Sequence, residues 1–251
     1  MSSESAAASA GLDPARMPAH VAMIMDGNGR WAKRRLMNRV RGHQRGVEVV
    51  RDMVRSCADL GIAHLTLYAF STENWARPRS EVSALMELLK KFLRNELGEM
   101  LENGIRLSTV GQIERLPADV REKLRDAIGK TAHGRRMTLH LALSYGGRDE
   151  LVSMARSLAE KVRDGELDPT HINEAAVAAH LYTRDVPDPD LLIRTSGEQR
   201  LSNFLLWQIA YAELFFTDTL WPDFTREELI QILRAYQGRD RRFGKVDPAA
   251  S

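Results

Sequence analysis

The fold class of this chain is decided by the stretch His20-Val21-Ala22-Met23-Ile24-Met25-Asp26-Gly27-Asn28-Gly29-Arg30-Trp31-Ala32. Its first six residues are almost continuously apolar, which is typical of a strand buried on both faces. The strand runs directly into an aspartate and a glycine-containing turn, and a helix start follows. A buried strand that passes through such a turn into a helix predicts the first unit of a parallel α/β sheet.

Five further apolar or alternating stretches predict strands, at residues 64–70, 105–110, 137–144, 190–194 and 212–216. Helical periodicity lies between them. Two long apolar stripes run over residues 47–60 and 82–101, and further helices are expected at 117–131, 148–163, 170–182 and 225–236. This order predicts an α/β fold with a mostly parallel six-stranded sheet, helices on both faces and no linker or internal repeat.

Length and composition favour one globular domain. The 251 residues include 43% hydrophobic and 28% charged side chains, enough for one substantial core. Residues 1–16 lack the basic start and apolar centre of a signal peptide, and we expect a disordered tail there, followed by a single domain over 17–251. The one cysteine, Cys57, is expected to be a buried small hydrophobe, as suits a reducing cytoplasm. No apolar run is long enough to span a membrane.

Positive charge is concentrated near the first strand. The net charge is only +2, yet residues 30–45 contain seven basic side chains and no acidic one, namely Arg30, Lys33, Arg34, Arg35, Arg39, Arg41 and Arg45. Such a run indicates an anionic partner. It would suit a nucleic-acid-binding module, but that reading gives no common purpose to the glycine turn and to the basic residues on distant segments.

The turn at residues 26–32 suggests a diphosphate cradle, because glycines allow backbone N–H groups to approach an anion. Gly27 and Gly29 partly match a dinucleotide fingerprint, but position 52, where an acidic residue at a strand end would be required, lies in a helical pattern. The lysine-containing phosphate loop of nucleotide hydrolases is absent. Taken alone, the motif could also be a turn in which Asp26 caps the next helix.

Two more strand ends carry polar clusters that belong at the same edge of a parallel sheet. Ser71-Thr72-Glu73-Asn74-Trp75 is followed by Arg77, and Arg194, Arg200 and Ser202 lie in and after the fifth strand. Guanidinium groups match paired anionic oxygens, so two arginines in one strand-end loop favour a phosphate site over solvated surface charge. Glu213 lies beside the last strand, where an ion pair to one of these arginines is the alternative reading.

Together these motifs resemble the cis-prenyltransferases, and in particular the undecaprenyl diphosphate synthases. The resemblance covers residues 17–244 and rests on the runs at 25–32, 42–43, 70–75, 145–148, 190–198 and 221–222. It implies a Mg²⁺-dependent homodimer that adds isopentenyl diphosphate to an allylic diphosphate, usually farnesyl diphosphate, by repeated cis condensation. The implied product is undecaprenyl diphosphate, the lipid carrier of peptidoglycan in cell-wall biogenesis. The implied location is cytoplasmic, with peripheral contact at the inner face of the membrane for product release and no nucleic-acid partner.

The resemblance also implies roles for individual residues. Asp26 and Asn74 would be catalytic, and Asp26 and Glu213 would hold the metal. The isopentenyl diphosphate would be bound by Arg194, Arg200, Leu201 and Ser202. The allylic diphosphate and the rest of the substrate site would involve Gly27, Asn28, Gly29, Arg30, Trp31, Arg39, His43, Ser71, Thr72, Glu73, Trp75 and Arg77.

Two positions depart from the family pattern. Gln199 replaces a histidine, and an amide is a poorer metal ligand that cannot titrate near neutral pH. Ser144 replaces an asparagine, and we expect a changed local hydrogen bond. A noncatalytic subunit is the main competing interpretation, but such a subunit is expected to lack Asp26 or other cradle residues.

A growing polyprenyl tail needs an apolar tunnel. We expect this tunnel between the sheet face formed by Leu65, Leu67 and Ala69 and the stripe of Val82, Leu85, Leu89, Phe92 and Leu101. Residues 212–221 and 239–244 are the expected contacts with a second subunit.

Overall fold

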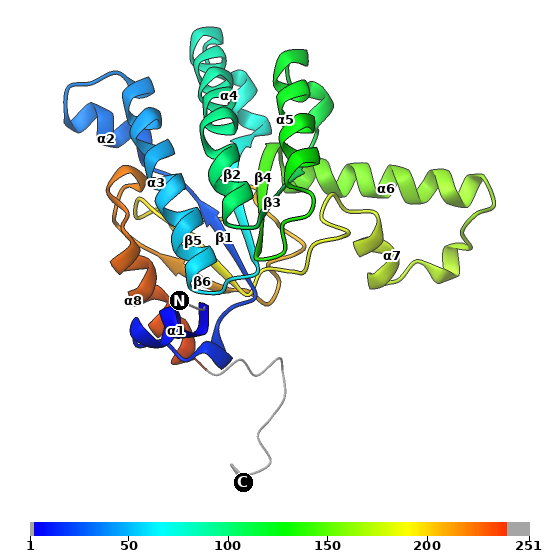
Figure 1. The fold of residues 1–251 in the computed structure, drawn as a ribbon. Helices are drawn as coiled ribbons and strands as arrows, with labels where there is room; N and C mark the ends of the chain where they lie inside the picture. Colours follow the sequence, from blue (N-terminus) through cyan, green and yellow to red (C-terminus); the bar gives the residue numbers. More distant parts are fainter. Residues whose placement is uncertain (1–2, 240–251) are drawn as a thin grey trace, which may run out of the picture.

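The computed structural model describes residues 3–239 and contains one all-parallel sheet of six strands in the order β3-β4-β2-β1-β5-β6 (Figure 1). The strands are β1 (His20–Ile24), β2 (His64–Ser71), β3 (Ile105–Val110), β4 (Met137–Tyr145), β5 (Leu191–Arg194) and β6 (Glu213–Phe216). Each agrees with its predicted stretch to within one residue. The single-domain α/β prediction is therefore confirmed.

The helices are α1 (Ser3–Ser9), α2 (Asn28–Arg34), α3 (Arg39–Asp59), α4 (Arg79–Glu102), α5 (Ala118–Thr131), α6 (Gly147–Arg163), α7 (Glu174–Ala179) and α8 (Arg226–Gln237). The continuous helix predicted over 170–182 is wrong. A 3₁₀ turn at Pro169–His171 is followed by the short α7, because the Asn173 side chain caps a new helix by accepting the Ala176 N–H at 3.0 Å.

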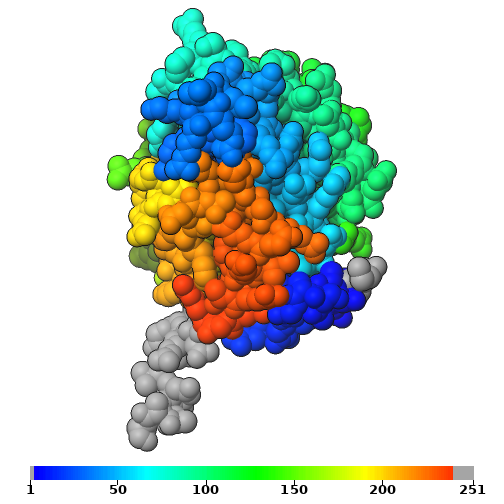
Figure 2. Space-filling model, turned by 90° about the vertical axis from the view of Figure 1, so that its left-hand side faces the viewer, coloured from blue at the N-terminus to red at the C-terminus, as the bar shows by residue number. Residues whose placement is uncertain are grey.

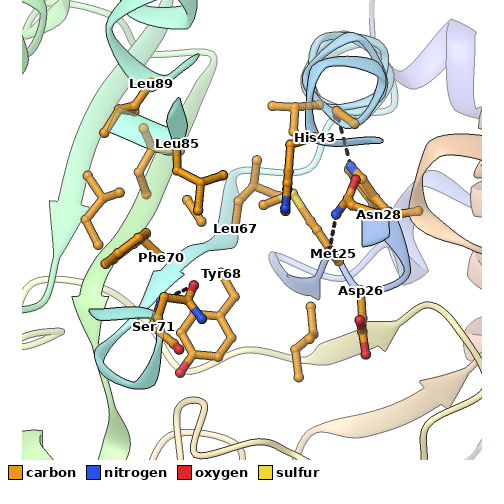
Figure 3. Close-up of a pocket in the computed structure, with 18 of the residues that line it drawn as sticks. Met25, Asp26, Asn28, His43, Leu67, Tyr68, Phe70, Ser71, Leu85 and Leu89 are labelled. Atoms are coloured by element: carbon orange, nitrogen blue, oxygen red, sulfur yellow. Dashed lines mark hydrogen bonds between the residues drawn. The ribbon is translucent and has the colours of Figure 1, made fainter. Parts of the chain in front are cut away.

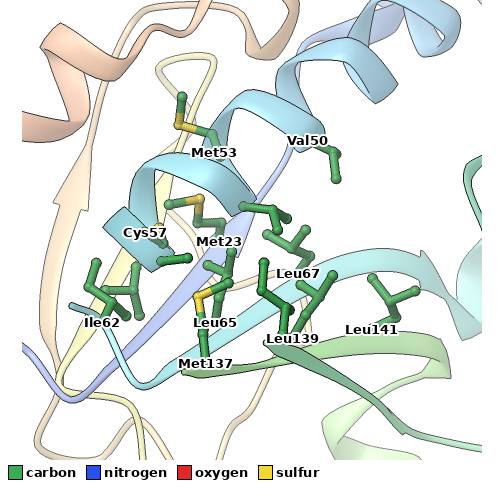
Figure 4. Packing of buried hydrophobic residues seen from close by; sticks show 14 of the residues in the cluster. Met23, Val50, Met53, Cys57, Ile62, Leu65, Leu67, Met137, Leu139 and Leu141 are labelled. Atoms are coloured by element: carbon green, nitrogen blue, oxygen red, sulfur yellow. The ribbon is translucent and has the colours of Figure 1, made fainter. Parts of the chain in front are cut away.

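Period-two alternation divides the sheet residues between two cores. Val21 and Met23 face α3, α4 and α5, which stand side by side over one face of the sheet (Figures 1 and 4). Ala22 and Ile24 face the opposite side, where they cluster with apolar side chains of the irregular segment 201–212. Cys57 lies in the first core with no exposed surface, and burial raises the pKa of its thiol to about 12, so its predicted role is confirmed.

A β-bulge interrupts the alternation in β2. Tyr68 pairs in register with Ala142 and Phe70 with the next residue, Leu143, so Ala69 is an extra residue in the strand. The bulge returns Phe70 to the core that also holds Leu65 and Leu67. Ala69 packs against the core that holds Leu65 and Leu67, so the predicted sharing of one face is confirmed, and the bulge adds Phe70 to that face.

The amino-terminal segment is more ordered than predicted. Residues 3–9 form α1, and Ala7 and Leu12 are buried with 1% and 4% of their surface exposed. Backbone contacts with α8 hold the segment, because Gln237 accepts the Asp13 N–H at 3.0 Å and donates to the Asp13 carbonyl at 2.8 Å. The disordered tail is therefore wrong for the described residues 3–16. Within residues 3–239, every helix is too short or too polar to cross a membrane.

Three histidines cluster at the amino-terminal end of the sheet. His20 approaches the Pro187 carbonyl at 2.6 Å and the Thr66 hydroxyl at 2.7 Å, and the His64 and His140 rings stack with centroids 5.4 Å apart. Burial, and then neighbouring positive charge, lower the pKa of His140 to about 3, and burial lowers the pKa of His20 to about 4. Both rings are therefore neutral in the folded protein at neutral pH.

This cluster predicts acid sensitivity. Because the folded-state pKa values lie below the usual 6.5, the unfolded chain binds more protons, so stability is complete above pH 6.5 and falls as the pH drops. Each histidine contributes a slope of about 1.4 kcal/mol per pH unit. Thermal melts between pH 7.5 and 5 should show a shallower decline for His140→Phe than for the parent chain, while the exposed control His133→Gln should keep the parent slope. Parallel curves for all three proteins would contradict this account.

Candidate active site

A cavity of about 690 Å³ opens beside the carboxyl ends of β1, β2 and β5 and extends between α3 and α4. One end is polar and the other apolar, as Figure 3 shows for Asp26, Asn28 and His43 on one side and Leu85 and Leu89 on the other. The predicted site residues that line it are Asp26, Asn28, His43, Ser71, Glu73, Asn74, Arg77, Arg194, Arg200 and Ser202.

An ion pair between Asp26 and Arg194 organises the polar end. Ile24 and Arg194 are register partners, so the residue two positions beyond β1 comes within reach of the guanidinium. Arg194 Nη2 donates to Asp26 Oδ2 at 3.0 Å, and the Gly27 N–H donates to Asp26 Oδ1 at 2.6 Å. Burial raises the pKa of Asp26, but hydrogen bonds from Arg194, Ser196 and Gly27 outweigh it, so the pKa lies below its ordinary value. The carboxylate is therefore ionised.

Arg194 also fixes the loop after β5. Its side chain is 3% exposed, and Nη1 donates to Ser202 Oγ at 2.7 Å and to the carbonyl of Arg200. Its Nε is buried without a hydrogen-bond partner among the described residues. Arg200 itself is 61% exposed and pairs with Glu198 at the rim. The loop thus presents two cations to the same cavity, the buried Arg194 and the largely exposed Arg200.

A second hollow of about 640 Å³ adjoins the first, and Asp26 lines both. Gly27, Gly29, Arg30 and Arg39 line this second hollow. Gly27 has a φ of 108°, and a Cβ there would lie 2.9 Å from the Leu220 side chain, so only glycine suits the position. Arg30 lies 3.6 Å from Asp26 and 3.3 Å from Glu198. Two cationic hollows therefore meet at one carboxylate.

Glu81 gathers three further basic side chains. Its carboxylate lies 2.9 Å from Arg77, 3.5 Å from Arg39 and 3.9 Å from His43. Burial and the nearby Arg77 charge lower the pKa of His43 to about 4, and its Nε2 is buried without a hydrogen-bond partner in the described chain. The His43 ring points into the cavity (Figure 3). A ligand anion would find unused donors here.

The 3₁₀ turn Thr72–Ala76 closes the β2 side of the cavity. Asn74 Oδ1 accepts the Ser71 N–H at 3.2 Å, which holds this side chain at the cavity wall. Glu73 accepts from Asn203 at 2.9 Å, and Thr72 donates to Asp149 at 3.1 Å. Thr72 therefore supports the loop instead of lining the cavity.

Besides Thr72, four predicted residues lie away from both hollows. Trp31 donates its indole N–H to Asp223 at 2.7 Å, and Trp75 donates its indole N–H to Ser144 at 2.9 Å. Each indole thus has its hydrogen-bond partner outside the cavity. Ser144 is the acceptor of the Trp75 bond, and whether an asparagine would change that bond stays a prediction. Leu201 packs in the second core. Glu213 is the register partner of Leu191 at the start of β6, about 10 Å before the strand end, so one chain does not bring it to Asp26.

Of the two predicted metal ligands, Asp26 is the one that lines the cavity. The described residues contain no group of three histidine, cysteine or carboxylate side chains able to hold a metal ion. Mg²⁺ commonly binds through one or two carboxylates plus substrate phosphates and waters. An ionised Asp26 between two phosphate-sized cationic hollows fits that pattern, whereas a ligand set that includes Glu213 of the same chain does not.

The apolar end agrees in part with the predicted tunnel. Leu67, Ala69, Leu85, Leu89 and Phe92 line it. Leu65 and Val82 instead pack in the surrounding core, and Leu101 is 50% exposed. The apolar stripe of α4 therefore lines the cavity from Leu85 to Phe92, and at Leu101 it faces solvent instead.

Sequence reasoning missed three residues that organise the site. Glu81 holds the basic cluster, Asn203 holds Glu73, and Trp221 donates to the Gly46 carbonyl at 2.9 Å beside the cavity. Asn203 directly follows Ser202 in the polar loop after β5, so its position was a usable signal. Glu81 lies in an ordinary helical first turn, and no pattern distinguished it.

The fold and site define an α/β protein with a cationic cavity that continues into an apolar end, and similarity to known proteins makes the class specific. Residues 24–244 match the prenyltransferase family described as "Putative undecaprenyl diphosphate synthase". An isoprenyl transferase of Heliobacterium mobile is 54% identical over 98% of this chain and 94% of its own length. The ditrans,polycis-undecaprenyl-diphosphate synthase of Micrococcus luteus, specific for (2E,6E)-farnesyl diphosphate, is 48% identical over 93% and 94%.

Solved structures agree. Lavandulyl diphosphate synthase from Lavandula x intermedia, in complex with dimethylallyl diphosphate, has a TM-score of 0.89 at 40% identity, covering 92% of this chain and 100% of its own. A chain from Campylobacter jejuni described as a probable undecaprenyl diphosphate synthase has a TM-score of 0.75 at 37% identity, covering 91% and 99%. This chain belongs to the undecaprenyl diphosphate synthase family of cis-prenyltransferases.

The position of Asp26 predicts that its carboxylate is required for activity. Asp26→Ala should abolish prenyl transfer while the circular dichroism spectrum stays unchanged, because Asp26 lies outside both cores. Loss of the partner of the buried Arg194 should cost about 1 to 3 kcal/mol of stability. Asp26→Asn retains an acceptor for Arg194, so it should be equally inactive with a smaller drop in melting temperature. Appreciable elongation by either folded variant would remove Asp26 from the mechanism.

Proposed function

We propose that this protein catalyses sequential cis condensation of isopentenyl diphosphate onto farnesyl diphosphate, with undecaprenyl diphosphate as the product used in cell-wall synthesis. The observation that carries the proposal is one cavity with buried, unpartnered donors of His43 and Arg194 at its polar end and an apolar channel at the other. An allylic diphosphate has an anionic head that suits the polar end and a growing hydrocarbon tail that suits the apolar channel.

The two hollows suit two diphosphates. The primer diphosphate would lie where the two hollows join, held by Arg30 and Arg39 of the second hollow and by His43 of the cavity, so that its tail enters the apolar end. Arg194, Arg200 and Ser202 of the cavity would hold isopentenyl diphosphate. Mg²⁺ bound through Asp26 and the primer diphosphate would supply charge neutralisation for the leaving group. The basic side chains stabilise the negative charge that develops as the allylic C–O bond breaks. Electrons of the isopentenyl double bond form the new C–C bond, and one proton leaves.

The site offers polar atoms near the place where that proton is lost. Asn74 and Ser71 line the same cavity as the polar and apolar ends. An amide is a weak base, so its role is to orient the isopentenyl unit and to pass the proton toward a diphosphate oxygen. The direct assay is purified protein with Mg²⁺, farnesyl diphosphate and labelled isopentenyl diphosphate, followed by measurement of organic-extractable product. Absence of labelled polyprenyl product would refute the proposal.

A homodimer is part of the proposal. β6 is an edge strand, and aromatic side chains are exposed near it, with Trp207 and Phe216 at 37% and Tyr211 at 72%. An apolar edge of this kind favours contact with a second copy. In such a dimer, Glu213 of one subunit could serve a site that its own chain does not reach. Of the expected contact at 239–244, residues 240–244 lie outside the described residues.

The assignment of the isopentenyl site predicts a selective kinetic defect. Arg200→Ala should raise the KM for isopentenyl diphosphate by roughly tenfold, since losing a charge-assisted phosphate contact costs about 1.5 to 3 kcal/mol and this side chain is largely exposed. Steady-state kinetics with each substrate varied will measure it, and Arg184→Ala, at an exposed pair elsewhere, is the control. A raised KM for the primer alone would show that Arg200 belongs to the primer site and not to the isopentenyl diphosphate site.

The channel predicts control of product length. Ala69→Leu adds a branched side chain at the bulge, where the strand lines the cavity, and close packing on the other side leaves little room for relief. The first condensation should persist while products become shorter, as judged by mass spectrometry after long incubation. Ala178→Leu on the exposed face of α7 should leave the product distribution unchanged. An active Ala69→Leu enzyme with full-length product would contradict the channel assignment.

A further inference from the structure

The turn between α2 and α3 exposes an apolar tip. Leu36 is 99% exposed and Met37 is 48% exposed, the two adjacent large apolar side chains most open to solvent on this part of the surface. Figure 2 shows the mid-blue residues of this segment on the outside of the molecule, with no other part of the chain covering them on the visible face. Single exposed leucines are common on protein surfaces, so exposure by itself does not indicate a binding surface, and a second observation is needed.

That feature is the backbone. The Leu36 N–H donates to Lys33 at 3.2 Å and the Met37 N–H to Ala32 at 2.9 Å, which is the hydrogen-bond pattern of a Schellman helix end. Leu36 occupies the left-handed position of this motif, with a φ of 56°, where glycine is the usual residue. A leucine there is conformationally unfavourable, and its side chain recovers nothing by packing within the chain.

Positive charge surrounds the tip. Arg35 pairs with Asp223 at 3.4 Å and Arg39 with Glu81 at 3.5 Å, whereas Lys33 and Arg34 form no ion pair with the described residues. The Arg41 side chain donates to the neutral Gln44 at 3.3 Å and forms no ion pair within residues 3–239. Exposed apolar side chains ringed by unpaired cations complement a lipid surface that carries negative headgroups.

The tip also belongs to the rim of the site. Leu36 and Met37 line the second hollow together with Asp26, Gly29 and Arg30. We propose that this tip, Leu36 and Met37 with Lys33, Arg34 and Arg41, docks the enzyme on a membrane containing anionic phospholipid, with the diphosphate end of the active site at the headgroup layer. The proposal rests on the proposed function, because an amphiphilic product has a charged head for that layer and a tail for the interior.

The sharpest test is Leu36→Gly. Glycine relieves the left-handed conformation, so the melting temperature should stay equal or rise, while loss of the apolar side chain should weaken membrane binding. Co-sedimentation with vesicles of phosphatidylcholine and phosphatidylglycerol will measure binding. We expect about tenfold weaker binding for Leu36→Gly and a larger loss for Leu36→Asp with Met37→Asp. Ile172→Asp, a matched change at a side chain 41% exposed elsewhere, should bind like the parent chain.

Charge variants distinguish the contribution of the basic side chains of the tip from that of its apolar side chains. Lys33→Glu with Arg34→Glu should weaken binding to the anionic vesicles, and pure phosphatidylcholine vesicles should bind all proteins weakly. Parent protein that fails to bind anionic vesicles, or Leu36→Gly that binds them fully, would overturn the proposal. So would a changed oligomeric state of the tip variants in sedimentation velocity, which would assign the tip to a second copy.

Turnover in detergent distinguishes this proposal from the proposed function. Arg34→Glu with Arg41→Glu, at two tip side chains that line neither hollow, should elongate farnesyl diphosphate normally in detergent, where docking is not needed. Loss of detergent activity would make the tip a lid of the substrate site and would refute membrane docking. Inactivity of the parent chain together with tip-dependent vesicle binding would instead refute the catalytic proposal alone.

Discussion

The site depends on the ion pair between Asp26 and Arg194, at 3.0 Å. It exists because β1 and β5 are parallel neighbours whose register places Ile24 opposite Arg194. Removing a guanidinium from water is unfavourable unless hydrogen bonds replace the lost hydration, and Arg194 donates such bonds to Asp26, Ser202 and the Arg200 carbonyl. The pair thereby ties the glycine turn after β1 to the polar loop after β5 and sets the distance between the two cationic hollows.

The arrangement leaves part of the bonding capacity unused. His43 and Arg194 each keep a buried nitrogen without a hydrogen-bond partner among the described residues, and both face the cavity. Buried donors are rarely left unpaired, because each costs free energy. A diphosphate would satisfy them, and Glu81 holds Arg39, Arg77 and His43 together in its absence. The polar end is therefore organised before a substrate arrives, which lowers the reorganisation needed for catalysis.

The apolar channel depends on a different constraint, the bulge at Ala69. Without an extra residue, Phe70 would face the opposite side of the sheet from Leu67. With it, the end of β2 presents consecutive residues to the cavity and then turns into the 3₁₀ segment that carries Asn74. The same local distortion thus shapes the channel wall and positions the polar residues at its mouth.

The sequence by itself determined the parallel α/β fold, the strand positions, the chemistry of the strand-end loops and the family, because buried strands, glycine turns and clustered arginines leave local patterns. Only the tertiary structure decided which side chains meet. Trp31 and Trp75 turn to Asp223 and Ser144, and Glu213 starts β6 at the far end of the sheet from Asp26, although all three belong to site motifs. The ordered segment 3–16, the bulge at Ala69 and the role of Glu81 were equally invisible. Side-chain direction follows from strand register and from partners distant in sequence, and spacing along the chain carries no record of either.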